Sequence, residues 1–278
     1  MPSAARKTVP TVAPDQYLQV GGARLRYRDS GTGPALLLLH GWTLDLEMWE
    51  PQVGALAGEF RLVRLDRRGH GLSGGSPEVS GDAQDAAALC QHLGLAHVAL
   101  LGMSQGARGA LALAVQDHSL VRALILDGPP ALEAGGAEED VPLEEYRRLI
   151  RTQGAEAFRR RWQDHPLMQL HSGTAGTRVL LAQMIGRYAG TDLLAASSAR
   201  PAQPLDPGLV RAPTLIVSGA LDLAGRLQSA ARLCAQLPHA ERALIAGAGH
   251  LPNLERAEEY SDLCRSFLRR HLPTHTAS

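Results

Sequence analysis

Short runs of apolar residues alternate with longer amphipathic stretches along most of this chain. The apolar runs are continuous enough to be strands buried on both faces of a sheet. They cover residues 35–39, 62–65, 98–101, 123–126, 214–217 and 242–245. The amphipathic stretches between them predict helices at residues 46–56, 82–93, 105–115, 226–237 and 255–268. Residues 17–20 and 24–28 flank two glycines and predict an initial hairpin. The pattern predicts an α/β fold, with a mostly parallel central sheet and helices on both faces.

The interval from residue 129 to residue 207 interrupts this alternation. It has helical periodicity but no convincing strand. A helical insertion between two parallel strands would cap the carboxyl edge of the sheet, where such folds bind ligands. A separate small helical domain away from that edge is the alternative. The chain therefore divides into a poorly ordered tail (1–15), an α/β core (16–128 and 208–272), a helical cap (129–207) and a C-terminal tail (273–278).

The strongest chemical signal is the pentapeptide Gly102-Met103-Ser104-Gln105-Gly106, which stands between a predicted strand and a predicted helix. This is the context that a G-x-S-x-G nucleophile elbow requires. The turn is sharp and strained, and side chains two residues to either side of the serine would collide with neighbouring elements. Because a free serine hydroxyl is a weak nucleophile, Ser104 needs a base.

The expected partners of Ser104 follow in the order typical of this arrangement. His250 comes directly after the last predicted strand and two closely spaced glycines, in a position suited to a general base. Asp222 follows the strand at 214–217 in a glycine-bearing turn and would orient the imidazole of His250. Asp127, which ends the strand at 123–126, is the rival acid. We favour Asp222 because its turn is longer and contains glycine.

Acyl transfer also needs hydrogen-bond donors for the developing oxyanion. One expected donor is the backbone N–H of Gln105, immediately after the nucleophile. The other is the N–H of Trp42, in the loop that follows the strand at 35–39. Gly41 gives this loop the freedom to turn that amide inward, while the Trp42 side chain packs.

Composition and charge remove several other classes of function. Lys plus Arg and Asp plus Glu both total 28, so the formal net charge is zero, and aromatic residues make up 4% of the chain. Neither value favours nucleic acid or an anionic membrane surface as a partner. No signal-like apolar segment, metal cluster or nucleotide loop is evident, so we expect no cofactor and no membrane span. Cys90, Cys234 and Cys264 are sparse and form no CxxC pair, which favours reduced thiols in a cytoplasmic protein.

Five segments together resemble the α/β-hydrolase superfamily, over residues 19 to 268. They are His40–Trp42, Asp66–Ser73, Gly102–Gly106, Gly219–Asp222 and Gly249-His250. The resemblance implies a serine hydrolase of that fold. These motifs are specific for the superfamily but not for any one reaction within it. His70 lies in a turn that the resemblance marks as structural.

Narrower resemblances point in different directions. Residues 40–49 are similar to pimeloyl-carrier-protein methyl esterases, and residues 66–73 resemble enol-lactonases and cofactor-free haloperoxidase relatives. Residues 104–108 and 158–168 resemble the menaquinone-pathway synthase that eliminates pyruvate from a cyclohexadiene carboxylate. That last resemblance implies that Arg108 and Trp162 help to hold an anionic substrate. The chain departs from the family pattern at Ala107 and after Asp222, where it reads Leu-Ala-Gly-Arg226.

The arginines allow two interpretations each. Arg108 falls one turn into the elbow helix, where a buried guanidinium would pair with a core carboxylate or grip a substrate carboxylate. Six further arginines in the cap form either a solvated helix face or an entry for acidic substrates or an acyl-carrier partner. They are Arg147, Arg148, Arg151, Arg159, Arg160 and Arg161.

These features support hydrolysis of a small carboxylic ester or lactone through an acyl-Ser104 intermediate, by a monomer or homodimer. A lyase in which Ser104 and His250 remove a proton and Arg108 holds a carboxylate is the alternative. A binding module that has lost catalysis is the third hypothesis, and the presence of all three triad residue types argues against it.

Overall fold

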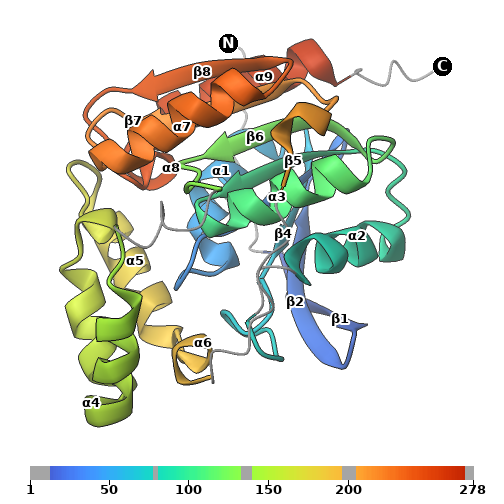
Figure 1. The fold of residues 1–278 in the computed structure, drawn as a ribbon. Coiled ribbons are helices and arrows are strands. Elements are labelled where there is room, and N and C mark those ends of the chain that lie inside the picture. Colours follow the sequence, from blue (N-terminus) through green and yellow to red (C-terminus); the bar gives the residue numbers. More distant parts are fainter. Residues whose placement is uncertain (1–12, 78–80, 133–139, 196–204, 273–278) are drawn as a thin grey trace, which may run out of the picture.

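The computed structural model describes residues 13–77, 81–132, 140–195 and 205–272. The predicted C-terminal tail and residues 1–12 of the predicted N-terminal tail lie outside them. An eight-stranded sheet in the order β1-β2-β4-β3-β5-β6-β7-β8 forms the centre of the molecule. β2 pairs antiparallel with β1 and β4, and the remaining neighbours are parallel. The predicted α/β class and mostly parallel sheet are confirmed (Figure 1).

The strands and helices follow the expected alternation. The strands are β1 (Gln16–Val20), β2 (Ala23–Ser30), β3 (Ala35–Leu39), β4 (Arg61–Leu65), β5 (Val98–Met103), β6 (Val121–Asp127), β7 (Thr214–Gly219) and β8 (Ala240–Ile245). The α-helices are α1 (Glu50–Leu56), α2 (Asp82–His92), α3 (Gln105–Gln116), α4 (Leu143–Gln163), α5 (Ala175–Arg187), α6 (Thr191–Leu194), α7 (Ala224–Gln236), α8 (Pro252–Glu255) and α9 (Ala257–His271). The 3-10 turns are η1 (Leu46–Trp49), η3 (Pro166–Met168) and η4 (Pro207–Leu209).

One predicted helix differs in its start. The helix expected over residues 255–268 begins at Ala257, and the short helix α8 precedes it. Arg256 separates the two with φ −128° and ψ 52°, which is not helical. Pro252 occupies the first helical position of α8, where its missing N–H costs nothing. The break leaves Glu255 at the end of α8 and buried.

Alternate residues of the parallel strands serve two separate apolar layers. In β3, Leu36 and Leu38 pack into the layer that contains α1, α9 and the helices between β6 and β7. Leu37 and Leu39 pack into the opposite layer with α2, α3 and α7. All four leucines are fully buried, as expected for a strand covered on both sides. This explains why the strand reads as a continuous apolar run rather than an alternating one.

Only helices and turns occur among the described residues between β6 and β7. They are α4, η3, α5, α6 and η4, and we call α4 to α6 the cap helices. Figure 1 shows these helices beyond the arrowheads of β5, β6 and β7. The predicted helical insertion therefore lies at the carboxyl edge of the sheet. Within the described part of the chain, no helix is long and apolar enough to cross a membrane.

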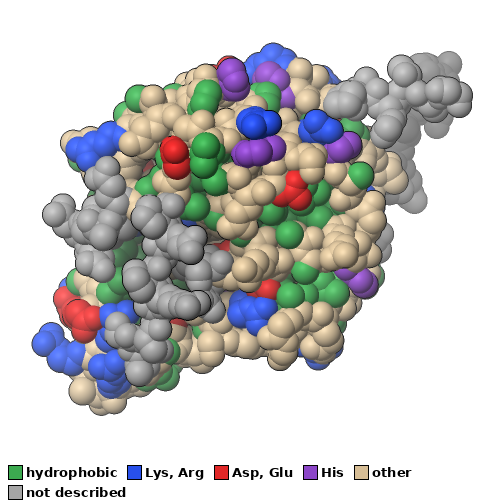
Figure 2. Space-filling view, turned by 45° about the vertical axis from the view of Figure 1, so that its right-hand side comes forward, with side chains coloured by type: hydrophobic (Ala, Val, Ile, Leu, Met, Phe, Trp, Pro, Cys, Tyr) green, Lys and Arg blue, Asp and Glu red, His purple; other side chains and the backbone are tan. Residues whose placement is uncertain are grey.

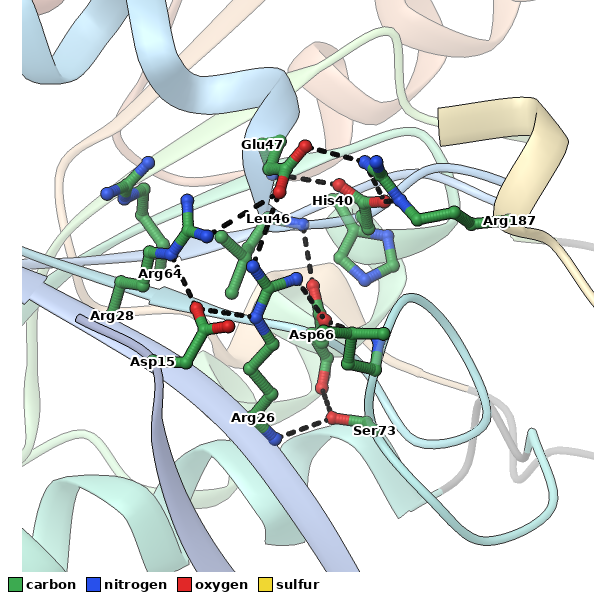
Figure 3. A network of polar contacts seen from close by, with 12 residues as sticks. Asp15, Arg26, Arg28, His40, Leu46, Glu47, Arg64, Asp66, Ser73 and Arg187 are labelled. Carbon is green, nitrogen blue, oxygen red and sulfur yellow. Dashed lines mark hydrogen bonds and ion pairs between the residues drawn. The ribbon is translucent and has the colours of Figure 1, made fainter. Parts of the chain in front are cut away.

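A network of charged side chains ties the antiparallel end of the sheet to the cap (Figure 3). Arg26 of β2 is almost fully buried and lies 3.2 Å from Asp66, 2.8 Å from Asp15 and 3.3 Å from Glu47. Arg187, at the end of α5, reaches the same Glu47 at 2.7 Å. Burial raises the pKa of Asp66 to about 6, and the carboxylate of Asp45 adds to this effect. The network compensates charges that would otherwise be costly to bury.

Replacing Arg26 by methionine should remove the positive charge and leave Asp66 buried beside other carboxylates. We expect the free energy of unfolding at pH 8 to fall by about 3–5 kcal/mol. The loss should be smaller at pH 5, because Asp66, whose pKa is already about 6, then takes up a proton. Urea denaturation at the two pH values measures both effects.

Arg24→Met is the matched control, because Arg24 lies on the same strand but is exposed and stacks on Tyr17. Its effect should stay within about 0.5 kcal/mol. Equal losses in the two variants would show that the buried network adds nothing to stability.

Candidate active site

The turn at Ser104 has the backbone geometry of a nucleophile elbow. Ser104 follows β5 and precedes α3 with φ 51° and ψ −116°. Thr43 is the only other described non-glycine residue with a positive φ. The amide of Ser104 donates to the carbonyl oxygen of Asp127 at 2.7 Å, which fixes the turn against the end of β6. Such strain is retained where surrounding structure enforces it, commonly at functional sites.

Both glycines of the pentapeptide are required because a side chain at either position would collide with backbone atoms, and not because the turn must be flexible. A Cβ atom on Gly102 would lie 2.4 Å from the carbonyl oxygen of Gly106. A Cβ atom on Gly106 would lie 2.4 Å from the carbonyl oxygen of Leu39, at the end of β3. Both obstacles are backbone and cannot move aside. The collisions expected from the sequence are confirmed.

Asp222 and His250 meet at the carboxyl edge of the sheet. The Nδ1 atom of His250 lies 2.8 Å from Oδ2 of Asp222, and both side chains are almost fully buried. The other oxygen of Asp222 accepts the N–H of Leu223 at 2.7 Å. The ring of His250 lies against Gly128, where a Cβ atom would be 2.9 Å from Cε1. Gly128 follows Asp127, so the ring is next to the residue that holds the amide of Ser104.

Asp127 lies in the same region without contacting the histidine through a hydrogen bond. Its side chain is fully buried beside Tyr260, whose hydroxyl interacts with the carboxyl group and acts against the effect of burial on its pKa. Burial raises its pKa well above the usual range, and the negative charge of Asp222 raises it further. Burial therefore favours the neutral form of Asp127, while Asp222 is the carboxyl group paired with His250.

The loop after β3 is held next to Ser104 by a neutral histidine. Nε2 of His40 accepts the N–H of Arg67 at 2.9 Å, and Nδ1 lies 2.7 Å from the carbonyl oxygen of Gly41. A backbone N–H can only donate and a carbonyl can only accept, so the ring carries its proton on Nδ1. Burial lowers the pKa of His40 well below its usual value, helped by His70 and Arg67. A Cβ atom on Gly41 would lie 3.5 Å from Cβ of Ser104, so the loop passes directly beside the serine.

The two amides expected to form an oxyanion hole flank this serine from different elements. Gln105 is the first residue of α3, so its N–H belongs to the helix turn that has no intrahelical acceptor. Its side-chain oxygen accepts from Arg67 at 3.0 Å, which anchors the start of the helix. Trp42 lies between Gly41 and the strained Thr43, and its indole N–H donates to Asp192 of α6 at 2.7 Å. Whether the two amides bind an oxyanion stays a prediction.

Trp162 is built into the junction between the cap and this loop. It is almost fully buried, and its indole N–H donates to the hydroxyl of Thr43 at 2.7 Å. Its ring stacks on His165 and meets Trp42 edge-on, with centroids 4.9 Å apart. The cap thus reaches the strained residue of the candidate oxyanion loop directly. Contact between Trp162 and a substrate stays a prediction.

Arg108 has no carboxylate partner in the described part of the chain. It is half-buried on α3, and it donates to the carbonyl oxygen of Ala131 at 3.0 Å. Burial lowers the pKa of its guanidinium. Of the two interpretations drawn from the sequence, pairing with a core carboxylate is not found among these residues.

The cap arginines lie along α4 and pair mainly with acidic residues of the same helix. The pairs are Arg147–Glu144, Arg159–Glu156, Arg160–Glu156 and Arg161–Glu145. In the space-filling view, basic and acidic side chains lie next to one another at the lower left (Figure 2). These pairs fit a solvated helix face. The acyl-carrier partner stays a prediction.

Two buried charged residues near the site were not identified from the sequence. Arg226 of α7 lies 3.0 Å from Asp140, just before the first cap helix. Burial lowers the pKa of its guanidinium, and the charges of Asp140 and Asp222 oppose this effect. Glu255 of α8 accepts the N–H of Gly249, the neighbour of His250, at 2.7 Å. Arg226 lies where the chain departs from the family pattern, and that departure is the feature of the sequence that could have identified it. At Glu255 the chain also departs from the family pattern, since Glu255-Arg-Ala lacks the frequent proline, but the residue reads as the start of a surface helix.

The chain belongs to the alpha/beta hydrolase fold family, whose sequence profile matches residues 34–257. It is 34% identical to 2-(acetamidomethylene)succinate hydrolase from Mesorhizobium japonicum over 131 residues, which is 44% of this chain and 47% of the relative. The chain therefore spans about half the length of several curated relatives that it matches.

Two solved structures match nearly the whole fold. A thermophilic esterase from Thermogutta terrifontis is 27% identical with a TM-score of 0.76, covering 93% of this chain and 99% of the esterase. The enol-lactonase from Burkholderia xenovorans LB400 is 27% identical with a TM-score of 0.73, covering 91% of this chain and 100% of the lactonase. The relatives and structures include hydrolases of several kinds, so the fold and family are shown while the reaction is not.

Two asparagine variants separate the roles of the carboxyl groups. Asp222→Asn should lower kcat for ester hydrolysis by a factor on the order of 10⁴, because the amide favours the wrong tautomer of His250. Asp127→Asn should keep kcat within about 3-fold, since burial already favours the neutral form of Asp127. Steady-state hydrolysis of p-nitrophenyl butyrate measures both. Loss of activity in Asp127→Asn alone would exchange the two assignments.

Asp127→Asn should also change how stability depends on pH. An acid whose pKa is raised by folding stabilises the folded state at low pH and loses that contribution as pH rises. The variant lacks this loss, so its free energy of unfolding should increase relative to wild type as the pH rises above about 4. Urea denaturation between pH 5 and pH 9 provides the comparison, and a constant difference would argue against a neutral Asp127.

Proposed function

We propose that this protein hydrolyses a small carboxylic ester or lactone through an acyl-Ser104 intermediate. One observation carries the proposal. Ser104 occupies a strained turn, with φ 51°, and its amide donates to the carbonyl oxygen of Asp127. The next residue, Gly128, lies against the ring of His250, whose Nδ1 is 2.8 Å from the buried carboxyl group of Asp222. This combination supplies the nucleophile, base and orienting acid that acyl transfer by serine needs.

In the proposed reaction, Nε2 of His250 takes the proton of Ser104 as Oγ attacks the carbonyl carbon. The amides of Trp42 and Gln105 stabilise the resulting oxyanion. The intermediate then collapses, and His250 gives its proton to the departing alcohol. Water attacks the acyl-enzyme with His250 as base, and the acid is released. Throughout, Asp222 accepts the Nδ1–H of His250 and stabilises the imidazolium.

The surroundings of the site support a small-molecule substrate. The cap helices lie over the carboxyl edge of the sheet, the usual place for a ligand in this kind of fold. Hydrolases of small organic esters, lactones and acids occur among the relatives and structural neighbours. The chemistry needs no cofactor, and we propose that the protein acts in the cytoplasm.

Ser104→Ala should abolish this activity. We expect hydrolysis of p-nitrophenyl acetate and butyrate to fall by several orders of magnitude, on the scale seen when a member of a catalytic triad is removed. Spectrophotometric release of p-nitrophenolate by variant and wild type, assayed side by side, provides the measurement. Activity that survives the substitution would point to a different nucleophile.

The half-buried Arg108 favours a second candidate, a lyase acting on an anionic cyclohexadiene substrate. Its guanidinium contacts one carbonyl oxygen and has no carboxylate partner among the described residues, so it can receive a substrate carboxylate. In this reaction His250, acting through Ser104, removes a proton from carbon, and the electron pair forms a C=C bond as the C–O bond to the leaving group breaks. The group leaves as the enolate of pyruvate and takes up a proton to give pyruvate. Labelling of Ser104 by a fluorophosphonate without turnover of any ester would favour the lyase.

Arg108→Met tests whether the guanidinium recognises an anion. We expect KM for a p-nitrophenyl monoester of a dicarboxylic acid to rise about 10-fold or more, because a charge-assisted contact is lost. The neutral substrate p-nitrophenyl acetate should be hydrolysed at an unchanged rate. Parallel effects on both substrates would assign Arg108 to the structure of α3 rather than to the substrate.

A further inference from the structure

Glu255 connects the loop of His250 with the cap. It is 5% exposed, and its two carboxylate oxygens bind different segments. Oε1 accepts the N–H of Gly249 at 2.7 Å, while Oε2 accepts the N–H groups of His171 at 2.6 Å and Ser172 at 3.0 Å. The Ser172 hydroxyl adds a bond to the Glu255 carbonyl oxygen at 3.2 Å. His171 and Ser172 lie between η3 and α5, in the cap.

The backbone that Glu255 holds is also linked to both members of the Asp222–His250 pair. Gly249 is bonded covalently to His250, and the carbonyl oxygen of Ala248 accepts the N–H of Leu221, next to Asp222, at 2.9 Å. The same stretch packs tightly on β7, since a Cβ atom on Gly219 would lie 2.0 Å from the Gly249 carbonyl oxygen. Movement of Gly249 would therefore displace the Asp222–His250 pair.

The cap also contacts this backbone directly. A Cβ atom on Gly249 would lie 2.7 Å from the ring of His171 and 3.4 Å from Oε1 of Glu255. Glycine at this position thus lets the cap segment and the carboxylate approach the loop together.

We propose that Glu255 is a positioning residue that makes the alignment of His250 depend on the seating of the cap. The inference rests on the proposed function, in which His250 is the general base. When the cap is in the position seen here, the amides of His171 and Ser172 in the cap and the amide of Gly249 all donate to the buried carboxylate of Glu255. When the cap moves, Oε2 loses its donors and Oε1 no longer holds Gly249 in a fixed position.

Three converging N–H donors explain why this residue is an acid. A carboxylate accepts on both oxygens, whereas glutamine offers one oxygen and one NH₂ group. In Glu255→Gln the NH₂ group must face either Gly249 or the two cap amides, so one side of the link is broken with almost no change of volume. Glu255→Met breaks both sides. Glu258→Gln is the matched control, because Glu258 is exposed in the first turn of α9.

The first measurement is labelling of Ser104 with a fluorophosphonate, together with hydrolysis of p-nitrophenyl butyrate. Glu255→Gln should lower the labelling rate and kcat by about 10- to 100-fold, the scale of a small misalignment of reacting groups. KM should change less than about 3-fold, and the final number of labelled sites per molecule should equal that of wild type. Glu255→Met should be slower still, and Glu258→Gln should match wild type. A role in folding alone would instead lower the number of labelled sites.

The second measurement is hydrogen exchange, which does not depend on activity. In Glu255→Gln, the amides of residues 248–250 and 170–173 should both exchange faster, while those of α9 stay protected. Faster exchange in one segment alone would overturn the link, as would labelling of Glu255→Gln at the wild-type rate. Failure of wild type to be labelled would reject the proposed function instead, and exchange would then decide whether the cap and the His250 loop are coupled.

Discussion

The close approach of the Ser104 turn to the end of β3 is the constraint on which the candidate site depends. Gly102 and Gly106 leave no room for a Cβ atom, because backbone oxygens lie 2.4 Å from where it would be. This contact gives Ser104 its positive φ and places the first amide of α3 beside the loop that follows β3. A parallel sheet brings the carboxyl ends of its strands to one edge, so Asp222 and His250 arrive at the same place from β7 and β8.

Burial determines the charge state of the groups around this edge. His40 is neutral because it is fully buried and because its two nitrogens serve one backbone donor and one backbone acceptor. Burial next to Asp222 favours the neutral form of Asp127. The two carboxyl groups therefore lie in different environments, and only Asp222 is paired with the histidine. Such a separation of roles is typical of sites whose environments move pKa values apart.

The cap is attached to the core at the loops that carry the candidate chemistry. Trp162 binds Thr43 and Asp192 binds Trp42, so two cap contacts fall on the candidate oxyanion loop. Arg187 adds an ion pair to Asp45 just beyond that loop, at 2.6 Å. Glu255 makes the corresponding link on the His250 side. These polar contacts add to the apolar packing of the cap on the core, and they fall on the loops that carry the candidate site.

The sequence by itself determined the order of strands and helices, the helical insertion and the pentapeptide around Ser104. Those features are local: continuous apolar runs, helical periodicity and glycines beside a serine are visible within a short window. The longer, glycine-bearing turn after β7 favoured Asp222 over Asp127, but only the tertiary structure shows that Asp222 is the aspartate that contacts His250. The tertiary structure also decided the partners of Trp162 and Glu255, which lie 119 and 84 residues away along the chain. Contacts over such separations depend on how the cap packs, and no local pattern of residues encodes that packing.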